Sequence, residues 1–312
     1  MTGTQQPSAG RPGGAPFGRM LTAMITPLTA DGALDADGAA HLATHLVDDM
    51  RNDGLVISGT TGESPTTSNA EKDQLLRAVI DAVGDRATVV AGVGTNDTAH
   101  TIELARAAER AGADALLVVT PYYNKPPQNG LVAHFTAVAD ATGLPVMLYD
   151  IPGRTGTPIT TESLVRLAQH PRIVAVKDAK GDLGASSQVM LGTDLVYYSG
   201  EDMLNLPMLA IGAAGFVSVV GHVVGDRLHE MIDAYLAGRV GEALEIHREL
   251  LPVYIGIMTR TQGAIATKAA LSLLGLPGGT VRGPLIGATP QQVERLRTDL
   301  VAGGVKLSGG AA

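Results

Sequence analysis

The chain has no cysteine and no tryptophan, and only 3% of its 312 residues are aromatic. Without cysteine the protein has no disulfide, no thiolate metal site and no cysteine nucleophile, which fits a reducing cytoplasm. With few aromatic residues and a net charge of -8, it lacks the basic, base-stacking surface of a nucleic-acid-binding protein. No apolar run reaches the roughly 18 residues that span a membrane. We therefore expect a cytoplasmic protein that binds neither nucleic acid nor membrane.

Hydrophobic residues, by contrast, make up 45% of the chain, which is enough for a large core. Residues 1–18 are rich in Gly, Pro, Ser and Gln and lack the apolar centre of a signal peptide, so we expect a disordered tail there. The remaining length fits a single barrel of roughly 250 residues with an appendage.

From residue 19 onward, short apolar runs alternate with segments of helical periodicity. Eight runs have the length and composition of buried strands: Met20–Thr26, Gly54–Ser58, Thr88–Val93, Ala115–Thr120, Pro145–Tyr149, Ile173–Lys177, Leu195–Ser199 and Gly215–Val220. The clearest helical segments between them are Ala36–Arg51, Asn69–Val83, Thr98–Ala111, Gln128–Ala141 and Thr160–Gln169. Asp97 or Thr98 is suited to cap the third of these helices, and Gly112 to end it.

Eight strand–helix units predict an α/β protein with a (β/α)8 barrel over residues 19–240. The competing fold, a doubly wound open sheet, usually carries a nucleotide loop. The nearest match, GVGTND at residues 92–97, lacks the third glycine of the dinucleotide fingerprint. Residues 241–312 contain no further strand candidate. They predict an appendage of three helices, Gly241–Ile257, Gly263–Leu274 and Pro290–Val301.

The sixth predicted strand ends on Lys177, with no turn residue before it. Strand alternation places Lys177 on one face with Ile173 and Ala175. If this face points into a barrel, burial lowers the pKa of the amine and frees it to form a Schiff base with a ketone. The alternative is a lysine whose stem lies along the strand end while its ammonium group reaches water.

Other polar residues follow the neighbouring strands, where barrel enzymes carry their chemistry. The loop GTTGES at residues 59–64 offers backbone N–H groups and hydroxyls that suit a carboxylate, or it is an ordinary turn. Tyr122 and Tyr123 follow the fourth strand and Tyr149 ends the fifth; such phenols relay protons or pack at a seam. Arg154 lies on a Pro/Gly-rich loop, where it can grip a carboxylate or pair with Asp150.

Five motifs occur in this order: GTTGES, TPYYNKPPQ, YDIPGRTG, VAVKDA and YYSGED. In sequence and spacing they resemble the dihydrodipicolinate synthase family of the pyruvate-dependent class I aldolase superfamily, to which N-acetylneuraminate lyase also belongs. The resemblance covers roughly residues 19–305. It implies a lyase that condenses pyruvate with aspartate 4-semialdehyde to 4-hydroxy-tetrahydrodipicolinate, in the diaminopimelate route to lysine.

The resemblance also implies catalytic roles for four residues. Lys177 would form the Schiff base with pyruvate. Tyr149 would act as general acid and base, and Thr61 and Tyr123 would complete a proton relay. In this family the residue at the Tyr123 position usually reaches a neighbouring subunit's site, so we expect a homotetramer built as a dimer of dimers.

For substrate binding, the resemblance implies a second set of roles. Thr60 and Thr61 would hold the pyruvate carboxylate, and Arg154 the carboxylate of the aldehyde. Gly200 and Val217 would line the pyruvate pocket through their backbone. No cofactor is required, and no metal is expected.

One group of positions departs from the family. Lysine-inhibited members carry a histidine where this chain has Asn69 and a glutamate where it has His100, and Lys72 stands where another histidine occurs. Ser64, Asn96 and Tyr122 match that regulatory site. Because His100 replaces a carboxylate that would face an ammonium group, we expect weak or absent inhibition by lysine.

Two alternatives stay open at this point. Another pyruvate-dependent aldolase, such as N-acetylneuraminate lyase or a 2-keto-3-deoxy sugar-acid aldolase, shares the lysine, the GTTGE-type loop and the tyrosine. Arg154 favours the synthase, because a short aldehyde with a carboxylate needs such a partner. The other alternative is a non-catalytic binding barrel, since one fold can host unrelated functions.

Overall fold

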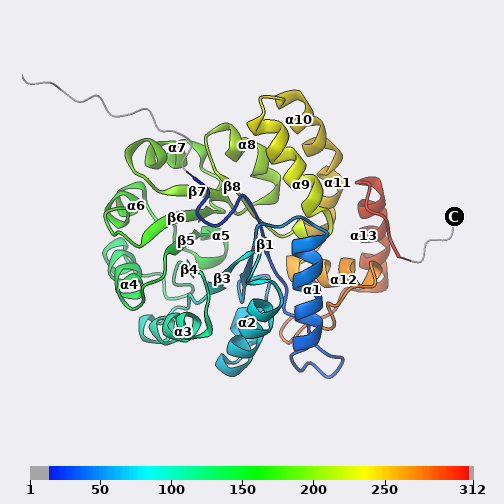
Figure 1. Cartoon of the computed structure of the whole chain (residues 1–312), viewed down its shortest axis with the longest axis horizontal. Coiled ribbons are helices and arrows are strands. Elements are labelled where there is room, and N and C mark those ends of the chain that lie inside the picture. The colour runs from blue at the N-terminus through cyan, green and yellow to red at the C-terminus, as the bar shows by residue number, and fades with distance from the viewer. Residues whose placement is uncertain (1–13, 309–312) are drawn as a thin grey trace, which may run out of the picture.

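The computed structural model describes residues 14–308, and its centre is a closed barrel of eight parallel strands in which β1 pairs with β8. The predicted (β/α)8 barrel is therefore confirmed. Figure 1 looks down the barrel, with the strands in the middle and the helices around them. The strands are β1 (Met20–Ala23), β2 (Gly54–Ile57), β3 (Thr88–Gly92), β4 (Ala115–Val119), β5 (Val146–Asp150), β6 (Ile173–Asp178), β7 (Val196–Ser199) and β8 (Gly215–Ser218).

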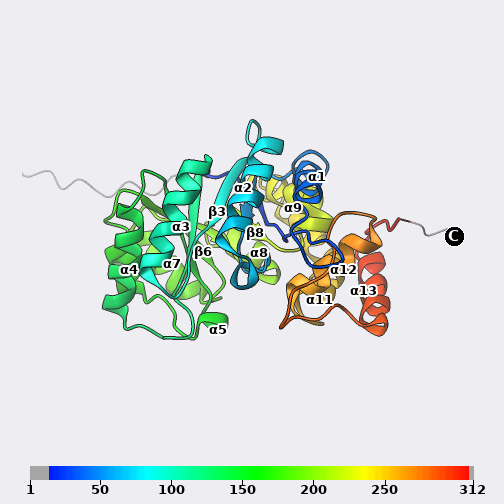
Figure 2. The same ribbon diagram turned by 90° about the horizontal axis from the view of Figure 1, so that it is seen from below.

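A layer of helices covers the outside of the barrel. These are α1 (Ala36–Asp48), α2 (Asn69–Val83), α3 (Thr98–Ala111), α4 (Gln128–Asp140), α6 (Thr161–Leu167), α7 (Leu183–Gly192), α8 (Asn205–Ala210) and α9 (Gly221–Leu236). Three short helical turns, α5 (Pro152–Thr155), η1 (Ser64–Thr66) and η2 (Asp202–Leu204), lie in the connections after β5, β2 and β7. Figure 2 shows α5 at one end of the barrel, which is the end where the strands terminate.

The end signals in the sequence explain where α2 and α3 begin and end. Ser68 caps α2 in a capping box with Glu71, so the helix starts at its predicted first residue. Asp97 caps α3 by accepting a hydrogen bond from the backbone of Ala99. Gly112 ends α3 with φ 94°, a left-handed conformation that glycine adopts without a steric penalty.

Two apolar clusters surround the barrel wall. The inner one contains alternate strand residues, among them Leu21, Val56, Leu117, Ala175 and Val217. The outer one lies between the strands and the covering helices. This arrangement explains why the strands are apolar on both faces and read as continuous hydrophobic runs.

The predicted face of Lys177 is correct for Ala175 and wrong for Ile173. Ala175 belongs to the inner cluster, whereas Ile173 packs in the outer one. The pairing of β5 with β6 shifts its register at Val146, so that Met147 pairs with Ala175 and one residue of β6 is skipped. Such an irregularity reverses the inside–outside alternation and leaves no mark in the sequence.

The C-terminal region contains four helices where three were predicted: α10 (Val240–Glu249), α11 (Leu251–Met258), α12 (Gly263–Leu273) and α13 (Pro290–Ala302). The predicted helix over residues 241–257 is divided at Leu250, where Pro252 stands in the first turn of α11. Proline cannot donate the backbone hydrogen bond that a continuous helix needs. Within residues 14–308, no helix is both long and apolar enough to cross a membrane.

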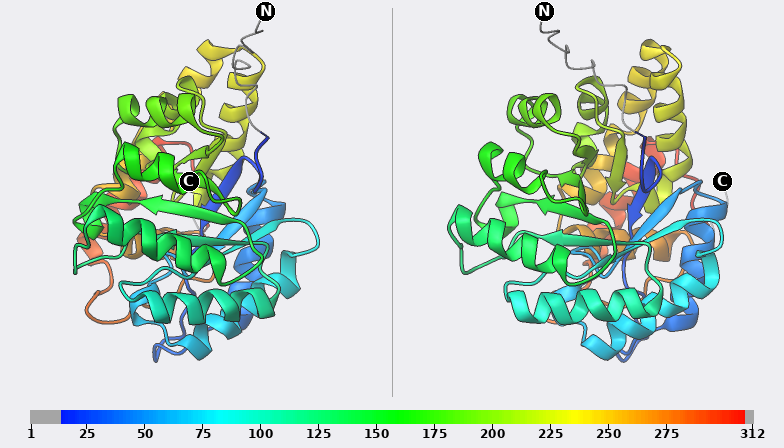
Figure 3. Two further views of the ribbon diagram at one scale, coloured as in Figure 1. Left: turned by 90° about the vertical axis from the view of Figure 1, so that its left-hand side faces the viewer. Right: turned by 60° about the vertical axis from the view of Figure 1, so that its left-hand side comes forward.

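The C-terminal helices share a hydrophobic core with the barrel. Val253, Tyr254 and Leu296 pack in one cluster with Met20 of β1 and Phe216 of β8. In Figure 1 these helices, coloured from yellow for α10 to red for α13, lie on the side of α1 and α9. They pack against one side of the barrel, and Figure 3 shows the same arrangement from two further directions.

The predicted disordered tail extends too far. Phe17 is buried, and its ring lies 6.1 Å from that of Tyr198 beneath the barrel interior. An aromatic residue next to the first strand is a candidate core residue. Phe17 was nevertheless assigned to the disordered tail, because the residues around it are rich in Gly and Pro. Residues 1–13, the rest of that prediction, lie outside the described part of the chain.

Candidate active site

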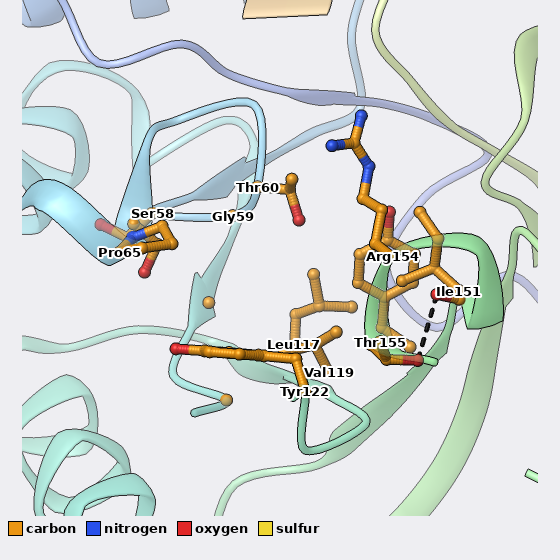
Figure 4. Close-up of a pocket in the computed structure, with 14 residues that line it drawn as sticks. Ser58, Gly59, Thr60, Pro65, Leu117, Val119, Tyr122, Ile151, Arg154 and Thr155 are labelled. Carbon is orange, nitrogen blue, oxygen red and sulfur yellow. Dashed lines mark hydrogen bonds between the residues drawn. The ribbon is translucent and has the colours of Figure 1, made fainter. Parts of the chain in front are cut away.

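A cavity of about 230 Å³ opens at the end of the barrel where the strands terminate (Figure 4). Thr60 and Tyr149, two of the residues expected in the site, line it together with Arg154. Tyr122 extends across one side with its hydroxyl toward Pro65, and Arg154 stands on the opposite side. The remaining lining residues are Ser58, Gly59, Ser64, Gly92, Gly94, Leu117, Val119, Ile151 and Thr155.

Lys177 is buried inside the barrel at the end of β6. Only 4% of the residue is exposed, and its Nζ lies 4.2 Å from the centre of the Tyr149 ring. The two residues are register partners in the β5–β6 pair. Burial lowers the pKa of Lys177 to about 8, because the ammonium form loses its hydration; Asp202 opposes the shift. The alternative of a lysine that reaches water is therefore wrong for this chain.

Tyr149 contributes a protonated hydroxyl next to this amine. Burial raises the pKa of Tyr149 to about 12, while Arg154 and the hydroxyl of Thr60 act in the opposite direction. The phenol thus holds its proton at neutral pH and can donate it to an oxygen in the cavity. Thr120 fixes the strand end that carries Tyr149, because its side chain and its backbone N–H both donate to the Tyr149 carbonyl, at 3.1 and 3.0 Å.

Arg154 is an exposed residue of α5 and does not pair with Asp150. Asp150 instead lies 3.3 Å from Nζ of Lys180 and accepts a hydrogen bond from the backbone of Ile159. The alternative role for Arg154, as a brace for its own loop, is therefore not what this structure contains. Its guanidinium remains available to an anion in the cavity.

Gly200, which follows β7, lies against the side chain of Lys177, and Val217 belongs to β8; neither residue lines the cavity. A Cβ at Gly200 would lie 2.9 Å from Cγ and 3.0 Å from Cε of Lys177, so only glycine leaves room for the lysine side chain. Val217 is fully buried in the inner cluster. Gly200 thus limits the space around the Lys177 side chain from one side.

Thr61 and Tyr123, like Lys177, Gly200 and Val217, are not among the residues that line the cavity of this chain. Thr61 follows Thr60 in the same loop but is buried outside the lining. Tyr123 is 89% exposed and has φ 74°, a left-handed backbone conformation that is unusual for tyrosine. Within the single chain, Tyr123 therefore contacts neither Tyr149 nor the cavity.

Asp202 is a residue of the site region that the sequence analysis did not single out. Its carboxylate is buried and accepts hydrogen bonds from the backbone N–H groups of Val219 and Val220, at 2.9 and 3.0 Å, and from the Ser218 hydroxyl. It thereby fixes the turn between β8 and α9 and places a negative charge near Lys177. An acidic residue directly after the seventh strand was the available signal.

The positions associated with lysine regulation lie where α2 and α3 begin. Nε2 of His100 lies 3.1 Å from Oδ1 of Asn69, which joins the two helices. Lys72 donates to the backbone carbonyls of Ser64 and Thr67, and burial lowers its pKa. These residues present imidazole, amide and ammonium groups and no carboxylate.

No metal site is apparent in the described residues: no three His, Cys, Asp or Glu side chains within residues 14–308 are grouped to hold an ion. His45, one of the two histidines four residues apart on α1, instead lies 2.7 Å from Asp49.

A closed barrel that buries a lysine beside a tyrosine at its carboxyl end has the arrangement of a lyase that activates carbonyl compounds through an imine. Comparison with known proteins agrees with this class. Residues 16–302 match the model of the dihydrodipicolinate synthetase family, and the chain belongs to this family.

Similar proteins match the chain over more than nine-tenths of its length. The chain is 69% identical to 4-hydroxy-tetrahydrodipicolinate synthase 2 of Streptomyces coelicolor over 94% of this chain and 97% of the relative. It is 71% identical to the synthase of Acidothermus cellulolyticus over 93% of this chain and 94% of the relative. The crystal structure of the Cyanidioschyzon merolae synthase with lysine bound superimposes with a TM-score of 0.91 at 40% identity, covering 93% of this chain and 99% of that one.

Proposed function

We propose that the protein condenses pyruvate with aspartate 4-semialdehyde to 4-hydroxy-tetrahydrodipicolinate, in the diaminopimelate route to lysine. The observation that supports this most strongly is the buried amine of Lys177, with its pKa of about 8, 4.2 Å from the ring of Tyr149. The relatives from Streptomyces coelicolor and Acidothermus cellulolyticus carry the name of this synthase. The relatives named above support neither a sugar-acid aldolase nor a non-catalytic barrel.

The reaction follows from the chemistry of an uncharged amine. Lys177 attacks the ketone carbon of pyruvate, and loss of water gives an imine. The imine draws electrons from the methyl group, which loses a proton to form an enamine. The enamine carbon attacks the aldehyde, whose oxygen takes a proton. The amino group of the second substrate then attacks the imine carbon, closes the ring and releases Lys177.

Each remaining site residue has a place in this sequence. Tyr149, protonated at neutral pH, supplies and recovers the protons of these steps. Thr60, which lines the cavity, holds the pyruvate carboxylate together with Thr61, and Thr61 also takes part in the proton relay. Arg154, on the opposite side of the cavity, holds the carboxylate of the aldehyde substrate. Gly200 and Val217 confine the keto acid next to Lys177.

We propose a homotetramer in which Tyr123 completes the proton relay of a neighbouring subunit. A tyrosine that is 89% exposed, held with φ 74° on the rim of the site, has the placement that such a contact requires. We place the protein in the cytoplasm, because its reaction belongs to amino-acid biosynthesis.

A substrate comparison tests this function. The purified protein should condense pyruvate with aspartate 4-semialdehyde and should cleave neither N-acetylneuraminate nor a 2-keto-3-deoxy sugar acid at a comparable rate. The variant Arg154→Met should lose about tenfold or more in kcat/KM for the semialdehyde, with a much smaller effect on pyruvate. Efficient sugar-acid cleavage, or an equal loss for both substrates, would contradict the assignment.

A further inference from the structure

Two non-glycine residues of the loop that carries Thr60 and Thr61 have a left-handed backbone conformation, which is unfavourable without supporting contacts. Ser58 and Glu63, at its two ends, have φ angles of 57° and 55°. Residues with a Cβ atom rarely occupy this left-handed region, and they stay there only where other contacts fix them. The shape of the loop therefore depends on what holds Ser58 and Glu63.

Glu63 is held from outside the loop, by the C-terminal region. Its Oε1 lies 2.6 Å from Nζ of Lys268 in α12, and each of the two side chains is only 3% exposed. Its Oε2 accepts a hydrogen bond of 2.9 Å from the backbone N–H of Arg282. Both carboxylate oxygens thus have partners in a segment that follows the barrel in the chain.

The contact reaches the binding residues through the backbone. The N–H of Glu63 donates to the carbonyl of Thr60 at 3.1 Å. The carbonyl of Glu63 accepts hydrogen bonds from the backbone and hydroxyl of Thr66 and from the hydroxyl of Thr67, at 3.0 to 3.1 Å. A displacement of Glu63 would therefore move the peptide of Thr60, which lines the cavity.

The side chain of Arg282 strengthens the same attachment. It donates to the carbonyl of Thr66 at 2.9 Å, to the carbonyl of Gly32 at 2.7 and 2.9 Å, and forms an ion pair with Glu71. Nearby, Leu28 pairs with Gly279, where a Cβ would lie 1.6 Å from the Leu28 carbonyl oxygen. The segment after α12 thus packs against the loops that follow β1 and β2.

We propose that Glu63 and Lys268 are positioning residues, whose buried ion pair holds the Thr60–Thr61 turn in the conformation that accepts the keto-acid carboxylate. Neither side chain touches the cavity, so the pair acts only through the backbone of the loop. The proposal rests on the proposed function for the identity of the ligand. It gives α12 a role in substrate binding besides its share in the hydrophobic core.

The test measures pyruvate affinity and fold stability separately in the full-length protein. Pyruvate is titrated alone, and the reduced adduct formed with borohydride is counted by mass spectrometry; a thermal melt is recorded in parallel. In Lys268→Met the carboxylate of Glu63 loses its buried partner. We expect the apparent pyruvate affinity to fall about tenfold, with Lys177 still fully modified at saturating pyruvate.

Two further variants separate positioning from folding. Glu63→Gln/Lys268→Met leaves no unpaired charge, so it should fold and recover part of the lost affinity. Arg260→Met removes the ion pair between the exposed Arg260 and Asp299 in the same C-terminal region. Neither residue belongs to the loop or lines the cavity, so pyruvate affinity should stay within about twofold.

The outcomes distinguish this proposal from the proposed function. Wild-type pyruvate affinity in a folded Lys268→Met, even with a lowered melting temperature, would overturn the positioning role. If Lys268→Met does not fold, wild-type affinity in the double variant would overturn it instead. No adduct in the unaltered protein would overturn the proposed function and, with it, this role of the pair.

Discussion

At the scale of single residues, the charge of Lys177 sets the rate at which the protein can react with a ketone. Burial lowers its pKa to about 8, and only the neutral amine attacks a carbonyl carbon. The rate constant for adduct formation with pyruvate should therefore rise about tenfold per pH unit below pH 8 and level off above it. Rapid-mixing kinetics between roughly pH 6 and pH 10 measure this. A rate that still rises steeply at pH 10 would mean that the amine has its ordinary pKa.

A second prediction for a single residue concerns Gly200, which leaves the space that the Lys177 side chain occupies. A Cβ there would press on Cγ and Cε of Lys177 and on the carbonyl oxygen of Asp178, at 2.9 to 3.2 Å. Gly200→Ala should displace the amine and lower kcat/KM for pyruvate by about 10- to 100-fold, because small displacements of reacting groups are costly. Gly192→Ala, where a Cβ would meet no atom within 4 Å, is the matched control and should keep its activity. Equal activity in both variants would show that the Lys177 side chain tolerates a methyl group at position 200, and would contradict the prediction.

Single residues were predictable from the sequence where a strand end identified them. Lys177 and Tyr149 each stand at the carboxyl end of an apolar run. Because the strands of the predicted barrel are parallel, both residues were expected at the same end of the barrel and close together. Asp202 was not predictable in the same way, since its importance comes from the backbone groups of residues 219 and 220, which join it only in the folded chain. Tyr123 remains a prediction, because its partner would lie in another subunit.

At the scale of secondary-structure elements, the starts of α2 and α3 determine the expected response to lysine. Asn69 and His100 face each other there across 3.1 Å and supply no carboxylate for an ammonium group. We predict that lysine at sub-millimolar concentration leaves the condensation rate unchanged. His100→Glu should increase sensitivity to lysine, since it restores the missing charge. Strong sub-millimolar inhibition of the unaltered protein would contradict this prediction.

Elements were predictable where local signals mark them. The bounds of α2 and α3 followed from helical periodicity, and for α3 also from the capping residue Asp97 and the terminating Gly112. The division between α10 and α11 was missed although Pro252 marks it, because the apolar periodicity continues across the break. The register shift in β6 was missed for a different reason: it depends on the pairing with β5, which a single strand does not encode.

At the scale of the whole molecule, the assembly makes a prediction of its own. If Tyr123 completes a neighbour's site, Tyr123→Ala should lose about 100-fold in kcat. Mixing it with the inactive Lys177→Met should restore activity, because each Lys177→Met subunit lends its Tyr123 to an intact lysine. Recovery of about a quarter of full activity is expected for random pairing in a dimer of dimers. Subunit exchange followed by an activity assay measures this, and no recovery after verified exchange would contradict the shared site.

The overall barrel was predictable because eight similar units repeat along the chain, whereas the contacts of its C-terminal helices were not. Glu63 and Lys268 are far apart in the sequence, and nothing in the sequence around either residue indicates that it is buried or paired. Their buried pairing exists only because α12 packs against the loop after β2. Long-range contacts between an appendage and a catalytic loop carry no periodic signal, so the structure was needed to find them.

The proposed function requires that the amine of Lys177 forms an imine with pyruvate. Borohydride reduction in the presence of pyruvate, followed by peptide mapping, detects this imine as a stable adduct. We expect one 1-carboxyethyl group per chain, on Lys177, and none in Lys177→Met. No modification of the unaltered protein, or modification of a different lysine, would contradict it.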